Sequence, residues 1–190
     1  MSSSPPHEVA PSTTPPPPPP PQYLIINNIQ KRKNIRDMLL SASAFGVAEV
    51  FVVGHKLLSF DQAMNIEDVL PGFQFPFRIT RFDTLAECRA HLVSIEPTVT
   101  ILGIEILHNA KSVNDVDVFQ GPTAVMAGNE GSGLSDAQVA ICDRFVYIPQ
   151  YGGGTASLNV TVATSIVMHA FALWAHDYST AGTPLLPVSK

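Results

Sequence analysis

Little in this sequence supports a disulfide, a metal centre or a membrane anchor. The 190 residues include two cysteines, Cys88 and Cys142, and neither has another Cys or a His at the spacing of a metal site. We therefore expect buried, reduced thiols and no bound metal. No apolar run reaches the roughly 18 residues of a membrane span, and the N-terminus has neither an apolar signal core nor the arginines of a transit peptide. These absences predict a cytoplasmic protein, with the nucleus as the alternative.

Positive charge is also scarce, because 11 Lys and Arg stand against 16 Asp and Glu and give a net charge of −5. This balance argues mildly against a general nucleic-acid binder. The basic residues are nevertheless clustered, with Lys31, Arg32, Lys33 and Arg36 inside the heptapeptide QKRKNIR. Such a cluster is either a solvated helix start or a local surface for phosphate groups, and composition alone does not decide between them.

The first 22 residues differ from the rest of the chain. They are rich in Ser, Thr and Pro and include seven consecutive prolines, Pro15 to Pro21. This composition predicts a disordered tail with a polyproline II stretch, more typical of a solvated spacer than of an SH3 or WW ligand. We expect one domain over residues 23–178, since 45% of the chain is apolar, and a flexible tail over 179–190.

From residue 23 onward, short apolar runs alternate with segments of helical periodicity. Ser135 is placed as the N-cap of one expected helix, with Asp136 in its first turn. Continuous apolar strands that alternate with helices predict an α/β fold with a largely parallel sheet, covered by helices on both faces. We expect strands at 23–27, 49–54, 98–105, 123–128 and 144–149, and helices at 34–45, 82–95, 135–143 and 158–176.

Two glycine-rich loops, at 128–135 and 151–154, follow the last two expected strands. The first strand-to-helix turn, NNIQKRKN, contains no glycine, which argues against a Rossmann dinucleotide site. Neither glycine loop carries the Lys-Ser/Thr pair of a Walker phosphate loop. These patterns favour a ligand with an uncharged or cationic reactive part over a nucleoside triphosphate.

Three segments resemble motifs of the SpoU (TrmH) family of S-adenosylmethionine-dependent RNA 2′-O-ribose methyltransferases. They are NIRDMLLSASAFG at 34–46, GNEGSGL at 128–134, and Ile148-Pro149 followed by SLNVTVA at 157–163. The resemblance spans residues 23 to about 176, with the motifs in order. It implies a six-stranded parallel sheet with a C-terminal deep trefoil knot, an architecture rare among proteins. In the threaded loop, Gly152, Gly153 and Gly154 would supply positive φ angles and close backbone contact.

The resemblance also implies a pocket for the methyl donor, S-adenosylmethionine. Main-chain groups of Gly128, Ile148 and Leu158 would hold the adenine, with Asn129 and Asn159 also at the cofactor.

Four positions match family residues around the reacting hydroxyl: Asn34, Glu130, Ser157 and Asn159. The resemblance gives Glu130 chiefly the role of anchoring its loop and neighbouring residues. The alternatives are a solvated loop carboxylate for Glu130 and an N-cap pair for Ser157 and Asn159 before the last helix.

One position departs from the family. An arginine that activates the 2′-hydroxyl usually stands six residues after the motif-one asparagine, but Leu40 stands there in this chain, and leucine cannot donate, accept or ionise. Arg36, one helical turn earlier, is the nearest substitute. We favour an active 2′-O-methyltransferase for tRNA or rRNA, with Arg36 or the RNA itself taking over this role. The alternative is a catalytically impaired module that binds donor and RNA without transferring a methyl group.

The implied site also suggests the partners. The basic residues 31–36 would lie at the mouth of the site, which favours the phosphate-binding interpretation and an RNA partner. The family resemblance further implies a homodimer through the first and last helices, with Phe171 and Trp174 as apolar contacts. Because helical extensions of the tRNA Gm18 enzymes are lacking, we expect a minimal catalytic domain whose target is chosen through the dimer surface or a partner protein.

Overall fold

The structure is a computed structural model that describes residues 18–54, 74–153 and 157–180. Most of the two expected tails, 1–22 and 179–190, lies outside the described residues. The first strand begins at Gln22, and the expected domain bounds stay a prediction.

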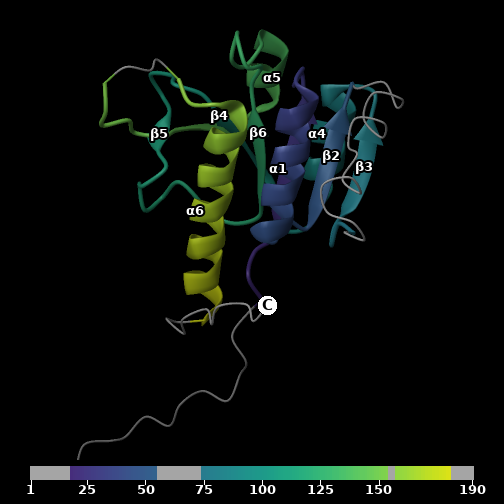
Figure 1. The fold of residues 1–190 in the computed structure, drawn as a ribbon. Helices are drawn as coiled ribbons and strands as arrows, with labels where there is room; N and C mark the ends of the chain where they lie inside the picture. The colour runs from purple at the N-terminus through teal and green to yellow at the C-terminus, as the bar shows by residue number, and fades with distance from the viewer. Residues whose placement is uncertain (1–17, 55–73, 154–156, 181–190) are drawn as a thin grey trace, which may run out of the picture.

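A single sheet of seven parallel strands forms the centre of the fold, in the order β3-β2-β1-β6-β4-β7-β5 (Figure 1). The strands are β1 (Gln22–Asn27), β2 (Glu49–Val53), β3 (Arg78–Phe82), β4 (Thr100–Ile104), β5 (Lys111–Ser112), β6 (Thr123–Ala127) and β7 (Arg144–Tyr147). The two-residue β5 adds a seventh strand to the six that the family resemblance implies. Residue patterns do not indicate β3, because this edge strand is partly exposed and contains two arginines.

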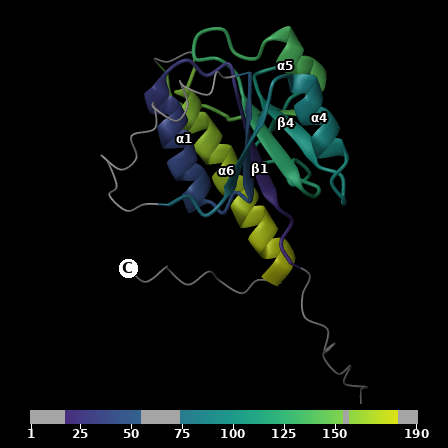
Figure 2. The same ribbon diagram turned by 90° about the vertical axis from the view of Figure 1, so that its right-hand side faces the viewer.

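Helices cover both faces of the sheet, as predicted. Figures 1 and 2 show α1 (Arg32–Ala44) and α6 (Val160–Thr180) side by side on one face, and α4 (Leu85–Val93) and α5 (Asp136–Ile141) on the other. Side chains of β1 alternate between the two layers. Leu24 and Ile26 belong to the core cluster that includes α1, whereas Tyr23 and Ile25 belong to the cluster that includes α4 and α5.

The predicted start of α5 is confirmed. Ser135 is the N-cap, and it forms a capping box with Gln138, while Asp136 lies in the first turn. The Gln138 side chain is fully buried and donates to the carbonyl groups of Asn27 and Ala127, both at 3.4 Å. Residue 138 therefore ties α5 to the carboxyl ends of β1 and β6.

Parallel pairing brings the carboxyl ends of the central strands to one edge of the sheet. The segments that follow β1, β4, β6 and β7 begin at Asn28, Glu105, Gly128 and Ile148, and they meet at this edge. Functional groups are therefore placed together by the sheet register, although they are far apart in the sequence.

The threaded loop differs from expectation at two of its glycines. Within the described residues, a Cβ at Gly152 or Gly153 would meet no atom within 4 Å, and neither residue has positive φ. Gly154 lies outside the described residues. Close contact and positive φ occur instead in the 128–134 loop. The trefoil knot stays a prediction.

Several expected features concern single side chains. Both cysteines are free, and burial raises the pKa of Cys88 to about 12, as expected for a structural thiol. Phe171 is buried against Phe119 within the chain, and the Trp174 ring contacts both of these rings. The burial of Phe171 does not support its expected role as a dimer contact. Among the helices that the structure describes, none is long and apolar enough to cross a membrane.

Candidate functional site

A pocket of about 440 Å³ lies at the carboxyl ends of β4, β6 and β7. Its volume is in the range of about 300–1,000 Å³ that is typical of small-molecule sites. The described lining residues include Ile104, Glu105, Leu107, Gly128, Asn129, Glu130, Leu134, Tyr147, Ile148, Gln150, Ser157, Leu158 and Val160. The pocket therefore has apolar walls and a small set of polar groups.

The 128–134 loop forms one wall, and its shape depends on two glycines. Asn129 and Gly133 exchange backbone hydrogen bonds of 2.8 and 3.1 Å, which fold the loop back on itself. A Cβ at Gly128 would overlap the backbone of Gly133, and Gly133 has a φ of +70°. Glycine is therefore required at position 128 for lack of space and is favoured at position 133 by the positive φ.

Glu105 supports this loop from the end of β4. Its Oε2 atom accepts from the Leu134 N–H at 2.9 Å, and its Oε1 atom accepts from the Ile106 N–H at 3.0 Å. The carboxylate lies so close to Gly133 that a Cβ there would overlap it. Sequence reasoning missed this residue, although its position directly after a buried strand was the available signal.

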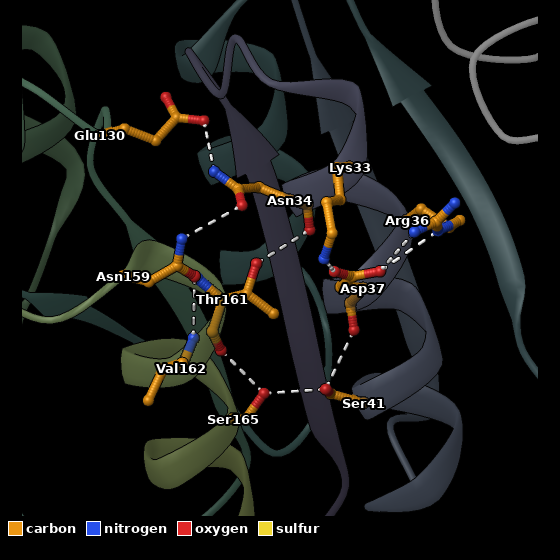
Figure 3. A network of polar contacts seen from close by, with 10 residues as sticks. All are labelled: Lys33, Asn34, Arg36, Asp37, Ser41, Glu130, Asn159, Thr161, Val162 and Ser165. Atoms are coloured by element: carbon orange, nitrogen blue, oxygen red, sulfur yellow. Dashed lines mark hydrogen bonds and ion pairs between the residues drawn. The ribbon is translucent and has the colours of Figure 1, made fainter.

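Glu130 connects the same loop to the start of α1. Its carboxylate accepts from the backbone N–H groups of Gln30 at 3.3 Å and Lys31 at 3.0 Å. It also accepts from Asn34 Nδ2 at 2.8 Å (Figure 3). The first turn of α1 contains no acidic residue, and its N-cap residue Lys31 makes no side-chain cap. Glu130 therefore supplies the negative charge that a helix N-terminus favours.

Asn34 and Asn159 extend this network to α6. The Asn159 Nδ2 atom donates to Asn34 Oδ1 at 3.3 Å, and Asn159 Oδ1 accepts from the N–H groups of Thr161 at 2.9 Å and Val162 at 3.4 Å. Asn159 is thus the N-cap of α6, one of the two roles considered for it. A continuous chain of hydrogen bonds joins the 128–134 loop, α1 and α6.

The Glu130 carboxyl group is held in its charged form. Partial burial acts to raise its pKa, but the hydrogen bonds from Asn34 and from backbone N–H groups outweigh this effect. The pKa of Glu130 therefore lies below its ordinary value of 4.5.

The structure brings most of the predicted site residues together. Six of them line the pocket: Gly128, Asn129, Glu130, Ile148, Ser157 and Leu158. Asn34 and Asn159 lie in the adjoining network, and Lys31, Arg32 and Lys33 are exposed at the start of α1 beside Glu130.

Arg36 is placed differently from the other predicted site residues. It is not among the described lining residues, and its guanidinium donates to Asp37 Oδ1 at 3.1 and 3.2 Å. Figure 3 shows this side chain pointing away from Asn34, Glu130 and Asn159. The placement does not support a catalytic role for Arg36 within the pocket of its own chain. Leu40, at the position of the family arginine, is half-buried.

Comparisons with known proteins show what the chain as a whole is similar to. The model of the SpoU rRNA Methylase family matches residues 21–169. A tRNA (guanosine(18)-2′-O)-methyltransferase of Escherichia coli is 24% identical over 76% of this chain and 59% of its own length. The 23S rRNA (guanosine-2′-O-)-methyltransferase RlmB of Shewanella oneidensis is 31% identical over 76% of this chain and 56% of its own length. The chain thus spans little more than half the length of these relatives.

A solved structure supports the fold. The AdoMet-bound rRNA methyltransferase from Sinorhizobium meliloti superposes with a TM-score of 0.65 at 20% identity, covering 80% of this chain and 56% of that one. The likeness establishes a shared architecture.

Removing the charge of Glu130 is expected to reduce stability in a pH-dependent way. Because the folded pKa is lowered, the contribution of the charge is complete above about pH 4.5 and is lost as the pH falls through the folded pKa. Glu130→Gln should lower the free energy of unfolding by about 1 kcal/mol at pH 7, the usual scale for such hydrogen bonds. Urea unfolding at pH 7, 5 and 3.5 measures this. A difference from wild type that stays constant down to pH 3.5 would contradict the role given to the charge.

Proposed function

The chain belongs to the SpoU rRNA methylase family, and on this basis we propose that it transfers the methyl group of S-adenosylmethionine to a ribose 2′-hydroxyl of tRNA or rRNA. The observation that best supports this proposal is the chain of hydrogen bonds from Glu130 through Asn34 to Asn159, because it joins all three family motifs beside one pocket. The names of the E. coli and S. oneidensis relatives support tRNA and rRNA as the substrate classes.

The residues of the pocket fit the methyl donor. Gly128, Ile148 and Leu158 all line it, and their main-chain groups are proposed to hold the adenine. Apolar residues such as Ile104 and Leu107 also line this space. When bound, S-adenosylmethionine supplies a methyl group on a positively charged sulfur. The absence of a Cβ at Gly128 lets the backbone of Gly133 and Leu134 pack directly against it, which gives this wall of the pocket its shape.

Asn34, Ser157 and Asn159 are proposed to position the ribose. In the transfer, the new O–CH₃ bond forms as the S–CH₃ bond breaks with its electron pair left on sulfur, and the 2′-hydroxyl proton must leave. Asn34 and Asn159 are held by Glu130 and by the start of α6, which gives the fixed orientation that such a displacement needs. With Arg36 bound to Asp37 and Leu40 unable to ionise, the proton is proposed to leave to the RNA or to solvent.

RNA is proposed to approach over the start of α1. Lys31, Arg32 and Lys33 are exposed there, and the backbone N–H of Lys31 lies 3.0 Å from the Glu130 carboxylate. These cations would contact phosphate groups next to the pocket, although the whole chain is acidic.

A homodimer through α1 and α6 is also proposed. On α6, the apolar side chains of Val162 and Leu173 are 46% and 51% exposed, so they are accessible to a partner. These side chains replace Phe171 as the apolar contacts of the proposed interface. A partner protein for target choice stays an additional proposal.

Donor binding should depend on glycine at position 128. In Gly128→Ala the added Cβ would overlap Gly133, so the affinity for S-adenosylmethionine is expected to fall at least tenfold. Gly121→Ala is the matched control, because a Cβ there meets no described atom within 4 Å. Calorimetric titration measures both. Equal affinity in the two variants would contradict the donor pocket.

Methyl transfer should depend on Asn34 and not on Arg36. Asn34→Ala breaks the link between Glu130 and Asn159, and a loss of about 10² or more is expected, the scale for a group that positions the reacting atoms. Arg36→Ala should remain within about threefold of wild type. The measurement is incorporation of label from S-adenosylmethionine into total RNA. A hundredfold loss of methyl transfer in Arg36→Ala would show that Arg36 has a catalytic role. A wild-type protein that binds the donor but transfers no methyl group would support the catalytically impaired module.

The proposed dimer should depend on the exposed side of α6. Leu173→Glu places a charge in the proposed apolar contact and is expected to weaken dimerisation at least tenfold. Val93→Glu is the control, because Val93 is similarly exposed, at 48%, but lies on α4 on the opposite face of the sheet. Sedimentation velocity of all three proteins at micromolar concentration measures this. A monomeric wild type would refute the dimer.

A further inference from the structure

The charged side chains of the pocket are of one sign. Among the lining residues that the structure describes, Glu105 and Glu130 are charged, and no Lys, Arg or His accompanies them. Two carboxylates without a described cationic side chain are an unexpected lining for a pocket proposed to bind S-adenosylmethionine, because that molecule itself carries a carboxylate.

The two carboxylates differ in their surroundings. Glu130 lies at the N-terminus of α1, where the N–H groups of Gln30 and Lys31, the Asn34 amide and the helix dipole offset its charge. Glu105 accepts from two backbone N–H groups at the end of β4, and no ion pair joins it to a described Lys or Arg. Its charge is therefore the less compensated of the two, and it lies beside apolar walls that screen poorly.

We propose that Glu105 is a specificity-determining residue that makes the pocket select the cationic methyl donor over its neutral product. The proposal rests on the function proposed above. S-adenosylmethionine carries a sulfonium, an ammonium and a carboxylate, with a net charge of about +1, whereas loss of the methyl group leaves a neutral thioether and a net charge of about zero. A carboxylate that no described cationic side chain offsets, beside apolar walls, attracts the cationic donor more than the neutral product.

The two hydrogen bonds that Glu105 accepts explain why a carboxylate, and not an amide, stands at this position. Both carboxylate oxygens accept, one from Leu134 and one from Ile106, and a glutamine has only one acceptor oxygen. Glu105→Gln therefore removes the charge and also disturbs the loop. The loop disturbance should weaken the binding of every donor analogue alike, whereas the loss of charge should weaken only the cationic ones.

The test is a calorimetric comparison of three ligands: S-adenosylmethionine, S-adenosylhomocysteine and sinefungin, in which an amine-bearing carbon replaces the sulfonium. In Glu105→Gln, the affinities for the two cationic ligands should fall roughly tenfold more than the affinity for S-adenosylhomocysteine. Glu105→Asp keeps the charge and should preserve the wild-type ratio, even if all three ligands bind more weakly.

Glu87→Gln is the control for a general loss of a carboxylate. Glu87 also accepts from two backbone N–H groups, at 3.1 and 3.0 Å, but it belongs to the capping box of α4 and not to the pocket lining. Glu87→Gln should leave all three affinities and their ratios unchanged, and melting temperatures confirm that each variant is folded.

The outcomes separate the two proposals. Equal losses for all three ligands in Glu105→Gln, or no loss, would overturn charge selection while leaving the donor site in place. A wild-type protein that binds none of the ligands would overturn the proposed function, and charge selection with it.

Discussion

The start of α1 depends on a charge that the helix does not supply. Its first turn has no acidic residue and its N-cap side chain makes no capping bond. The negative charge at this helix start comes from Glu130, about 100 positions later in the chain, which accepts from the N–H groups of Gln30 and Lys31 just before the first turn. The same carboxylate fixes Asn34, which in turn meets the cap of α6. One electrostatic contact therefore sets where two helices begin relative to the 128–134 loop, and the pocket wall cannot shift without disturbing both.

The loop itself is held from two sides by carboxylates. Glu130 ties it to α1, and Glu105 ties it to the end of β4, in each case through backbone N–H groups. Charge-assisted bonds to backbone suit this purpose, because they are stronger than neutral ones and independent of neighbouring side chains. The close approach at Gly128 and the positive φ of Gly133 then follow, since a loop clamped this tightly leaves no room for a Cβ.

Sequence patterns predict the features of this fold that depend on neighbouring residues, such as buried strands and helix caps. The buried strand that leads to Glu105 and the capping role of Ser135 were readable from spacing alone, and the motifs identified the pocket residues. Strand β3 was not readable, because an edge strand need not alternate cleanly. The contact of Asn34 with Asn159 also joins residues 125 positions apart, so only the fold brings them together. Glycine spacing likewise misplaced the tight backbone contact at 152–153.

Helix geometry explains why Arg36 lies apart from the network. Successive residues are rotated by about 100° around a helix axis, so Arg36 lies about 200° from Asn34, nearly on the opposite side of α1. Position 40 lies about 240° from Asn34 by the same geometry, and so shares the side of Arg36. A side chain at either position is therefore poorly directed toward the pocket of its own chain. An arginine at position 40 would be better directed toward the pocket of a second copy, if the proposed homodimer forms. Leu40 would then remove a contribution to that neighbouring site, while leaving the network of Asn34, Glu130 and Asn159 in its own chain intact.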